Sequence, residues 1–335
     1  MFVYAIASLA PIFLIAAASL LGGTWAHLVF VYMAIFVAAL DRIVSKVRPA
    51  SVGDEFPAAT ALMVALAFAH FCGLYLAVEA LVSERFTLLQ KASILLGAGL
   101  WFGQVSNSNA HELIHRQNRL LRGLGKWIYI SLLFGHHTSA HVLVHHVHVA
   151  SDADPNSARL GESFYRFFIR SWKGSFVKSL KIETARLRQS GRKLASHPFV
   201  AYIGGAIGFM ALSALLFGVP GLIAYCALAF HAQSQLLLSD YVQHYGLRRR
   251  VDGTGRLEPV SAAHSWNAPK WYSSAMMLNA PRHSDHHLRP MAPFPTLELT
   301  DAPTLPRSLP VMATIALVPP LWRRVMNRRV AIWAK

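Results

Sequence analysis

Residues 92–115 read ASILLGAGLWFGQVSNSNAHELIH, and this stretch decides the class of fold. Its first part, residues 92–110, has no charged side chain, and a helix needs about 20 mostly apolar residues to cross a bilayer. The stretch then ends in an HExxH motif, His111-Glu112-Leu113-Ile114-His115. Histidines four residues apart lie on one face of a helix. The stretch therefore predicts a membrane-spanning helix that ends in a pair of candidate metal ligands.

The whole chain has the composition of a membrane protein. It has 335 residues, of which 54% are hydrophobic and 14% charged, whereas soluble chains carry about 25% charged residues. The run 194–239 is long enough for two spans and is broken at Gly218-Val219-Pro220-Gly221. We expect an all-α integral membrane protein with about six transmembrane helices, at 1–22, 24–40, 56–78, 92–110, 198–217 and 221–240.

Two apolar segments need a separate interpretation. Residues 127–140 are too short to span and lie beside histidines, so we expect a re-entrant or interfacial helix there. The opening run, 1–22, lacks both a basic start and a small-residue cleavage site before the next span. We therefore expect it to be a span and not a removed signal peptide.

The positive charges predict the topology. The net charge is +16, and the basic residues lie outside the apolar runs, a pattern that suits membrane topology better than nucleic-acid binding. The segments 41–55, 116–196 and 245–335 hold most of the Lys and Arg and would all face one side of a six-span protein. The positive-inside rule predicts cytoplasmic termini and a cytoplasmic cap, 116–196 and 245–335, on one membrane domain that covers 1–335.

Histidines gather at the predicted cytoplasmic ends of the spans. Besides the HExxH pair, the chain has three such groups, His141-x-x-x-His145-His146, His244, and His283-x-x-His286-His287. Spacings of three and four residues should present several imidazoles to one point. Nine histidines are too many for one metal, so two ions are implied. Imidazole suits zinc, copper, iron or nickel, and two redox metals facing an apolar pocket suggest oxygen activation.

Other interpretations of these histidines explain less of the sequence. A zinc protease with Glu112 as general base would need one further ligand and would leave the other groups without a role. A metal transporter would place polar residues at mid-span, whereas these lie at span ends. Eight histidines lie outside the four groups. We assign His27, His70, His197 and His231 to structural roles, and leave His136, His137, His148 and His264, which lie near the site, open.

Several motifs resemble a known family. They are Asn109–His115, Asp154–Ser163, His244-Tyr245-Gly246-Leu247, His264-Ser265-Trp266-Asn267 and Arg282–His287. These resemble the membrane-bound alkane 1-monooxygenases and the related xylene monooxygenase hydroxylase subunits, within the fatty acid desaturase superfamily. The His-Tyr-Gly element is typical of the hydrocarbon monooxygenases and is missing from ordinary desaturases. Ala140 and Gln243 stand where alkane enzymes usually have Glu, and both resemble the xylene-type subunits.

The resemblance implies a non-haem di-iron monooxygenase in the inner membrane of a bacterium, with its metal site on the cytoplasmic side. The implied iron ligands are His111, His115, His141, His145, His146, His244, His283, His286 and His287. With O2 as co-substrate, the implied reaction is terminal hydroxylation of a medium-chain alkane to a primary alcohol. Hydroxylation of the methyl group of xylene or toluene, and desaturation of an acyl chain, remain as alternatives.

Electrons must reach such a site from another protein. The two cysteines, Cys72 and Cys226, form no CxxC pair, so we expect a separate rubredoxin or ferredoxin-type donor with its reductase. Beside the ligands, Glu112, Asp240 and Asp285 are candidates to orient the imidazoles. Four side chains at mid-depth are candidates for the floor of a pocket for the hydrophobic substrate within the lipid bilayer: Met33, Phe36, Trp101 and Phe102.

Overall fold

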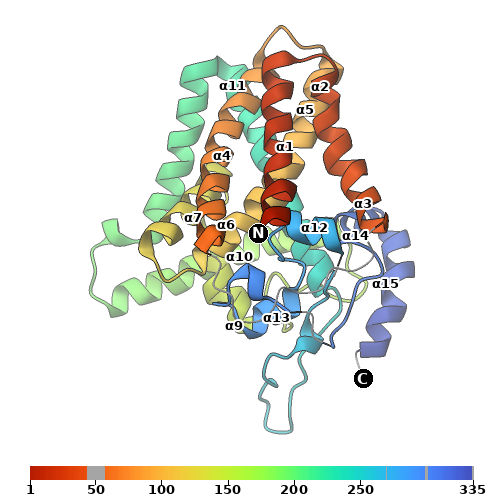
Figure 1. Cartoon of the computed structure of the whole chain (residues 1–335). Helices are drawn as coiled ribbons and strands as arrows, with labels where there is room; N and C mark the ends of the chain where they lie inside the picture. Colours follow the sequence, from red (N-terminus) through yellow and green to blue (C-terminus); the bar gives the residue numbers. More distant parts are fainter. Residues whose placement is uncertain (44–56, 269, 299–300, 334–335) are drawn as a thin grey trace.

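The computed structural model describes residues 1–43, 57–268, 270–298 and 301–333. Figure 1 shows a bundle of long helices, with shorter helices gathered at one end of it, around the N-terminus. The described residues form helices, turns and two isolated β-bridges, Val251 with Leu257 and Asn267 with Thr304. The chain is therefore an all-α protein, as predicted.

The bundle contains four helical segments that are long and apolar enough to cross a membrane among the described residues: Phe2–Leu21, Thr24–Ile43, Ala58–Val82 and Pro198–His244. The second segment comprises α2 (Thr24–Val31), a π-helical turn and α3 (Val37–Ile43). The third lies in α4 (Pro57–Val82). These segments agree with the predicted membrane class, while the count of six spans stays a prediction. Phe56 and most of the basic segment 41–55 lie outside the described residues.

The predicted span at 92–110 is assembled from three consecutive helical pieces. They are α5 (Leu88–Trp101), a π-helix (Phe102–Ser106) and α6 (Asn107–Ile114). Thr87 caps the start of this continuous helical segment with a capping box. Its hydroxyl accepts from the Gln90 N–H, and the Gln90 side chain accepts from the Thr87 N–H. The helical segment ends with His111 in α6 and His115 directly after α6. It therefore carries the first two histidines to the end of the bundle.

The helix α11 (Pro198–His244) has 47 residues and is broken at Gly218. Gly218 has φ 66° and ψ −165°, a combination that is essentially restricted to glycine. Pro220 follows, and its fixed φ suits the start of a second helix. The break lies at the start of the predicted interruption, Gly218–Gly221, and the second half of α11 brings His244 to the same end of the bundle as α6.

The cap is built from the remaining helices. These are α7 (Arg119–Ser131), α8 (His137–Ala140), a π-helix (His141–His145), α9 (His146–His148), α10 (Phe164–Gln189), α12 (Trp271–Met276), α13 (His283–Leu288), α14 (Leu309–Ala316) and α15 (Pro319–Trp333). Residues 127–140, predicted to be a re-entrant or interfacial helix, comprise the end of α7, a turn and α8. The short helices α9 and α13 lie below the ends of the bundle in Figure 1.

The candidate floor residues differ in their surroundings. Met33, Trp101 and Phe102 are buried in the helical core, and the Trp101 Nε1–H donates to the Ser8 carbonyl at 3.1 Å. Phe36 is 44% exposed and packs against Tyr32 and Tyr272. Phe36 is thus too open to be the floor of an enclosed pocket, because it stands on the outer face of its helix.

We expect Gly218→Ala to destabilise the protein by about 1–3 kcal/mol, because a Cβ makes this backbone conformation costly. The nearest atom to an added Cβ is the Pro220 Cδ at 3.6 Å, so the effect comes from backbone strain and not from a clash. Gly208→Ala is the matched control, since it lies in the same helix with no atom within 4 Å of an added Cβ. Thermal unfolding of the purified variants measures both. Equal melting temperatures would contradict the role of Gly218.

Candidate metal centre

Nine buried or half-buried histidines form two groups among the described residues. One group contains His111, His115, His141, His146 and His286, and the other contains His145, His244, His283 and His287. In each group, one nitrogen from every ring lies within 4.8 Å of the corresponding nitrogens of the others. The members come from α6, the helix of residues 137–148, the end of α11, and α13. These are the nine positions that the sequence predicted as ligands.

The first group has the spacing of ligands around a common ion. The Nε2 atoms of His111 and His141 lie 2.7 Å apart, and those of His146 and His141 2.9 Å apart. Two imidazole nitrogens that bind one ion at about 2.1 Å and at right angles lie about 3 Å apart. His115 adds a buried Nε2 that has no hydrogen-bond partner among the described residues. A metal ion would satisfy this nitrogen.

The second group repeats this arrangement. The Nε2 atom of His283 lies 2.8 Å from that of His244 and 3.1 Å from that of His287. The Nε2 of His145 is buried without a hydrogen-bond partner in the described part of the chain. The two groups are neighbours, because the ring centroids of His146 and His287 are 4.8 Å apart. The donor set therefore fits two metal ions at adjacent positions.

We expected closely spaced histidines of one helix to bind the same ion, and this was only partly right. His111 and His115 share a group, as do His283 and His287, but His141 and His145 belong to different groups. Residues 141–145 form a π-helix, which takes more residues per turn than an α-helix. This places His146, five residues after His141, in the group of His141, and directs His145 to the other group.

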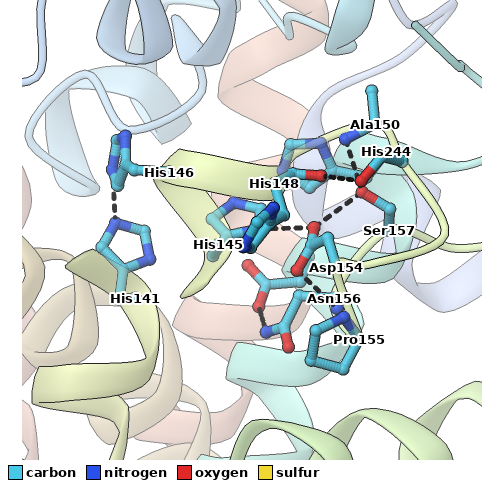
Figure 2. Close-up of polar contacts among 12 residues, drawn as sticks. His141, His145, His146, His148, Ala150, Asp154, Pro155, Asn156, Ser157 and His244 are labelled. Atoms are coloured by element: carbon cyan, nitrogen blue, oxygen red, sulfur yellow. Dashed lines mark hydrogen bonds and ion pairs between the residues drawn. The ribbon is translucent and has the colours of Figure 1, made fainter. Parts of the chain in front are cut away.

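A buried carboxylate fixes the orientation of His145. Figure 2 shows Asp154 beside this ring, and the Nδ1 of His145 lies 2.9 Å from the Asp154 Oδ2. Because a carboxylate accepts, Nδ1 carries the proton and Nε2 keeps its lone pair for a metal. Asp154 is itself held by the Ser157 hydroxyl at 2.7 Å and the Asn156 N–H at 3.0 Å. We did not single out Asp154 from the sequence, although it begins the Asp154–Ser163 motif.

The three carboxylates that were candidates for this role make other contacts. Glu112 pairs with Arg116 at 2.5 Å and accepts from the Phe294 N–H at 3.0 Å. Asp285 pairs with Arg289 at 2.5 Å and accepts from the Glu298 N–H.

Glu112 and Asp285 therefore tie loop 294–298 to the helices that carry the ligands. Asp240, the third candidate, accepts from the Asn156 side chain at 2.6 Å and so supports the turn that holds Asp154.

The other eight histidines stand outside both groups. Four have hydroxyl or amide partners: His27 with Ser93, His70 with Ser106 and Ser131, His197 with Thr184, and His231 with Gln235. His264 belongs to a capping box with Ser261 and bonds to Glu258 at 3.0 Å. His136 packs among Phe134, Trp172 and Phe176, and His137 stacks on Phe134. His148 is half-buried at the end of α9.

Burial keeps the three histidines of α13 in the form that binds metals. In α13, burial and then the neighbouring imidazoles lower the pKa of His286 and His287 well below the usual value. Burial likewise lowers the pKa of His283 to about 3. Metal ligation requires the neutral imidazole. These three rings are therefore ready to bind metal at neutral pH without losing a proton.

Comparisons with known proteins agree with this site. The family model for fatty acid desaturases matches residues 86–315. Alkane 1-monooxygenase 2 of Alcanivorax borkumensis is 29% identical over 91% of this chain and 83% of its own length. Alkane 1-monooxygenase 1 of Pseudomonas aeruginosa is 34% identical over 70% of this chain and 63% of its own.

A further relative is the xylene/toluene monooxygenase hydroxylase component XylM of Pseudomonas putida, which is 28% identical over 70% of this chain and 63% of its own length. The chain thus spans less than two thirds of the Pseudomonas relatives. The matched region includes the α6, α11 and α13 histidines. This chain therefore belongs to the fatty acid desaturase family.

Proposed function

We propose that the protein is a di-iron monooxygenase that hydroxylates the terminal carbon of a medium-chain alkane. The observation that carries this proposal is the pair of adjacent histidine groups, five and four rings, at one end of an apolar helical bundle. An all-imidazole donor set suits iron, and it differs from the three or four protein ligands that are typical of one zinc. The names of the relatives support a hydrocarbon as substrate.

The reaction balances as R–H + O2 + 2 electrons + 2 protons giving R–OH and water. When bound, the two ions would supply the activation of O2. The nine histidines would hold them, and Asp154 would keep the Nε2 of His145 turned toward its ion. Loop 294–298, held by Glu112 and Asp285, would help to keep bulk water from the rings. The chain's own contribution is thus ligation, orientation and exclusion of water.

The electrons would come from a separate rubredoxin or ferredoxin-type protein that meets the cap from the cytoplasm. A basic hairpin, residues 248–258, projects away from the bundle in Figure 1. Arg250 and Arg256 are exposed on it, and an acidic donor would be attracted to such a surface. Glu258 at its base bonds to His264, within the His264–Asn267 motif that was noted in the sequence. The hairpin therefore offers a contact surface close to the metal site.

Two alternatives for the substrate remain open to experiment. Ala140 and Gln243, together with the XylM relative, favour an aromatic methyl group as the second candidate. An acyl chain is a third, because the family model is that of desaturases. Gln243 joins α11 to the segment before α13 by donating to the Ala280 carbonyl at 3.2 Å. It thus supports the ligand segment whichever substrate binds.

The first test of the function is a substrate panel. Membranes that contain the chain alone, with NADH, should leave medium n-alkanes, xylene and acyl esters unchanged. Addition of a rubredoxin or ferredoxin-type donor and its reductase should give primary alcohols from the alkanes, because the chain has no CxxC pair for an iron–sulfur site. Gas chromatography with mass detection identifies the products. Unsaturated esters formed from the acyl esters, with no alcohol from the alkanes, would point to the desaturase alternative. Turnover with NADH alone would exclude a separate donor.

The second test is metal content. Purified protein should hold about two irons per chain and little zinc, since nine imidazoles exceed one zinc site. His244→Ala should lower the iron content and abolish turnover, because His244 and His283 share a group. His27→Ala is the control and should keep iron and most of the activity, since His27 bonds only to Ser93 at 2.9 Å among the described residues. A stoichiometry of one zinc would overturn the di-iron assignment.

The third test concerns Asp154. Asp154→Asn should weaken iron binding about 10- to 100-fold, because the amide orients His145 less strongly than the carboxylate does. Asp152→Asn, two residues away, is the matched control, since its side chain is 88% exposed and lies 3.7 Å from Arg248. Iron retention during titration with a chelator measures the difference. Equal retention in both variants would show that Asp154 serves the fold of its turn and not the metal.

A further inference from the structure

A cavity separate from the histidine groups opens where the span Thr24–Ile43 leaves the bundle. Its volume is about 460 Å³, which is within the usual range for ligand sites. Its walls come from α3, the segment before α12, the segment before α14, and α14 and α15 themselves. These elements lie together at the right of Figure 1, at the level where the bundle meets the cap. The lining residues include none of the nine histidines.

The charge of this cavity is strongly positive. Its lining contains the basic residues Arg42, Lys270, Arg307 and Arg329 and one carboxylate, Asp41. The four cations come from four different segments, so no single sequence run explains why they meet. The lining groups thus carry a net charge of +3, from four positive and one negative side chain. Basic pockets beside membrane helices bind the phosphate groups of lipids.

The lining also has an apolar part. It includes Val311 and Ile315 of α14 and Val325 of α15. Just beyond α14, Leu317 and Val318 are 39% and 51% exposed, as expected for a surface that meets lipid. A free anion would gain nothing from these side chains. A molecule with a charged head and a hydrocarbon tail would contact both the charged and the apolar part of the lining.

Asp41, the one carboxylate of the lining, is bound to the start of α12. Its Oδ1 accepts from the Tyr272 and Ser273 N–H groups at 2.9 and 3.0 Å. Its Oδ2 is buried and has no hydrogen-bond partner among the described residues. This oxygen is enclosed by protein atoms and cannot be reached from the cavity. The preference of the cavity therefore comes from its four cations, which select an anionic head group.

We propose that this cavity binds one phosphatidylglycerol molecule, with its phosphate on the arginines and its acyl chain along α14. Such a lipid would join the end of the second span to α12, α14 and α15. Because α12 leads directly to the ligand helix α13, the bound lipid would stabilise the cap that carries His283, His286 and His287.

The experiment uses the full-length, iron-loaded chain in nanodiscs of phosphatidylcholine. Four arms compare phosphatidylcholine alone with added phosphatidylglycerol, added phosphatidylethanolamine and added inorganic phosphate. We expect only phosphatidylglycerol to raise the melting temperature and to remain bound, one molecule per chain, in native mass spectrometry. The same rise with inorganic phosphate would show a free-anion site and overturn the lipid assignment. An equal rise with phosphatidylethanolamine would remove the requirement for an anionic head group.

Variants localise the effect. Arg307→Gln with Arg329→Gln should weaken retention of phosphatidylglycerol about 25-fold, since each cation near an anionic lipid contributes about fivefold. The control pair, Arg188→Gln with Arg192→Gln, removes the same charge from exposed positions at the end of α10 and should retain the lipid. Val311→Trp fills the cavity from its apolar side without changing charge and should also release the lipid. Retention by the cavity variants equal to that of the control pair would refute the site.

Discussion

The packing of nine imidazoles against one another is the constraint on which the rest of the structure depends. Within each group, several neighbouring Nε2 atoms lie about 3 Å apart, as near as 2.7 Å for His111 and His141. Imidazoles that are so close and so buried cannot all be charged, because like charges repel and burial disfavours the charged form. In the neutral form, nitrogen lone pairs that face one another lack hydrogen-bond donors. Metal ions remove both difficulties at once. The spans, the cap and the carboxylates can be understood as the means of holding these rings before metal arrives.

The carboxylates near the ligands hold the rings in two ways, by contact with an imidazole or by contact with a nearby loop. Asp154 acts on a ring directly and sets which nitrogen of His145 faces its group. Glu112 and Asp285 instead accept backbone N–H groups of Phe294 and Glu298, which are far from Glu112 in sequence. Each of these two also pairs with an arginine four residues further along its own chain segment. A carboxylate between two ligands thus holds a distant loop against the helix that carries the ligands. Proximity in sequence does not distinguish this role from contact with an imidazole ring.

The class of fold and the identity of the clustered histidines could be predicted from the sequence, because both depend on local pattern. Charge-free runs mark helices that meet lipid, and histidines three or four residues apart mark one face of a helix. The division of the nine rings could not be predicted, since it depends on the π-helix at residues 141–145, which has no clear signature in composition. Asp154 was missed for a similar reason. Its contact with His145 requires the turn that Asn156 and Ser157 stabilise, and that turn is held by Asp240 from another helix.

The two His-His pairs explain why the groups are neighbours. Consecutive residues on a helix point about 100° apart, so adjacent histidines cannot serve one ion in the same way. His145 joins the second group and His146 the first, while His286 joins the first and His287 the second. Each pair of adjacent histidines therefore lies between the two groups and contributes one ring to each. The helical segments that carry the two pairs pack beside each other there. A change in register of one residue in either helix would exchange a ligand between the groups, so the positions of both ions are set by the same two short segments of backbone.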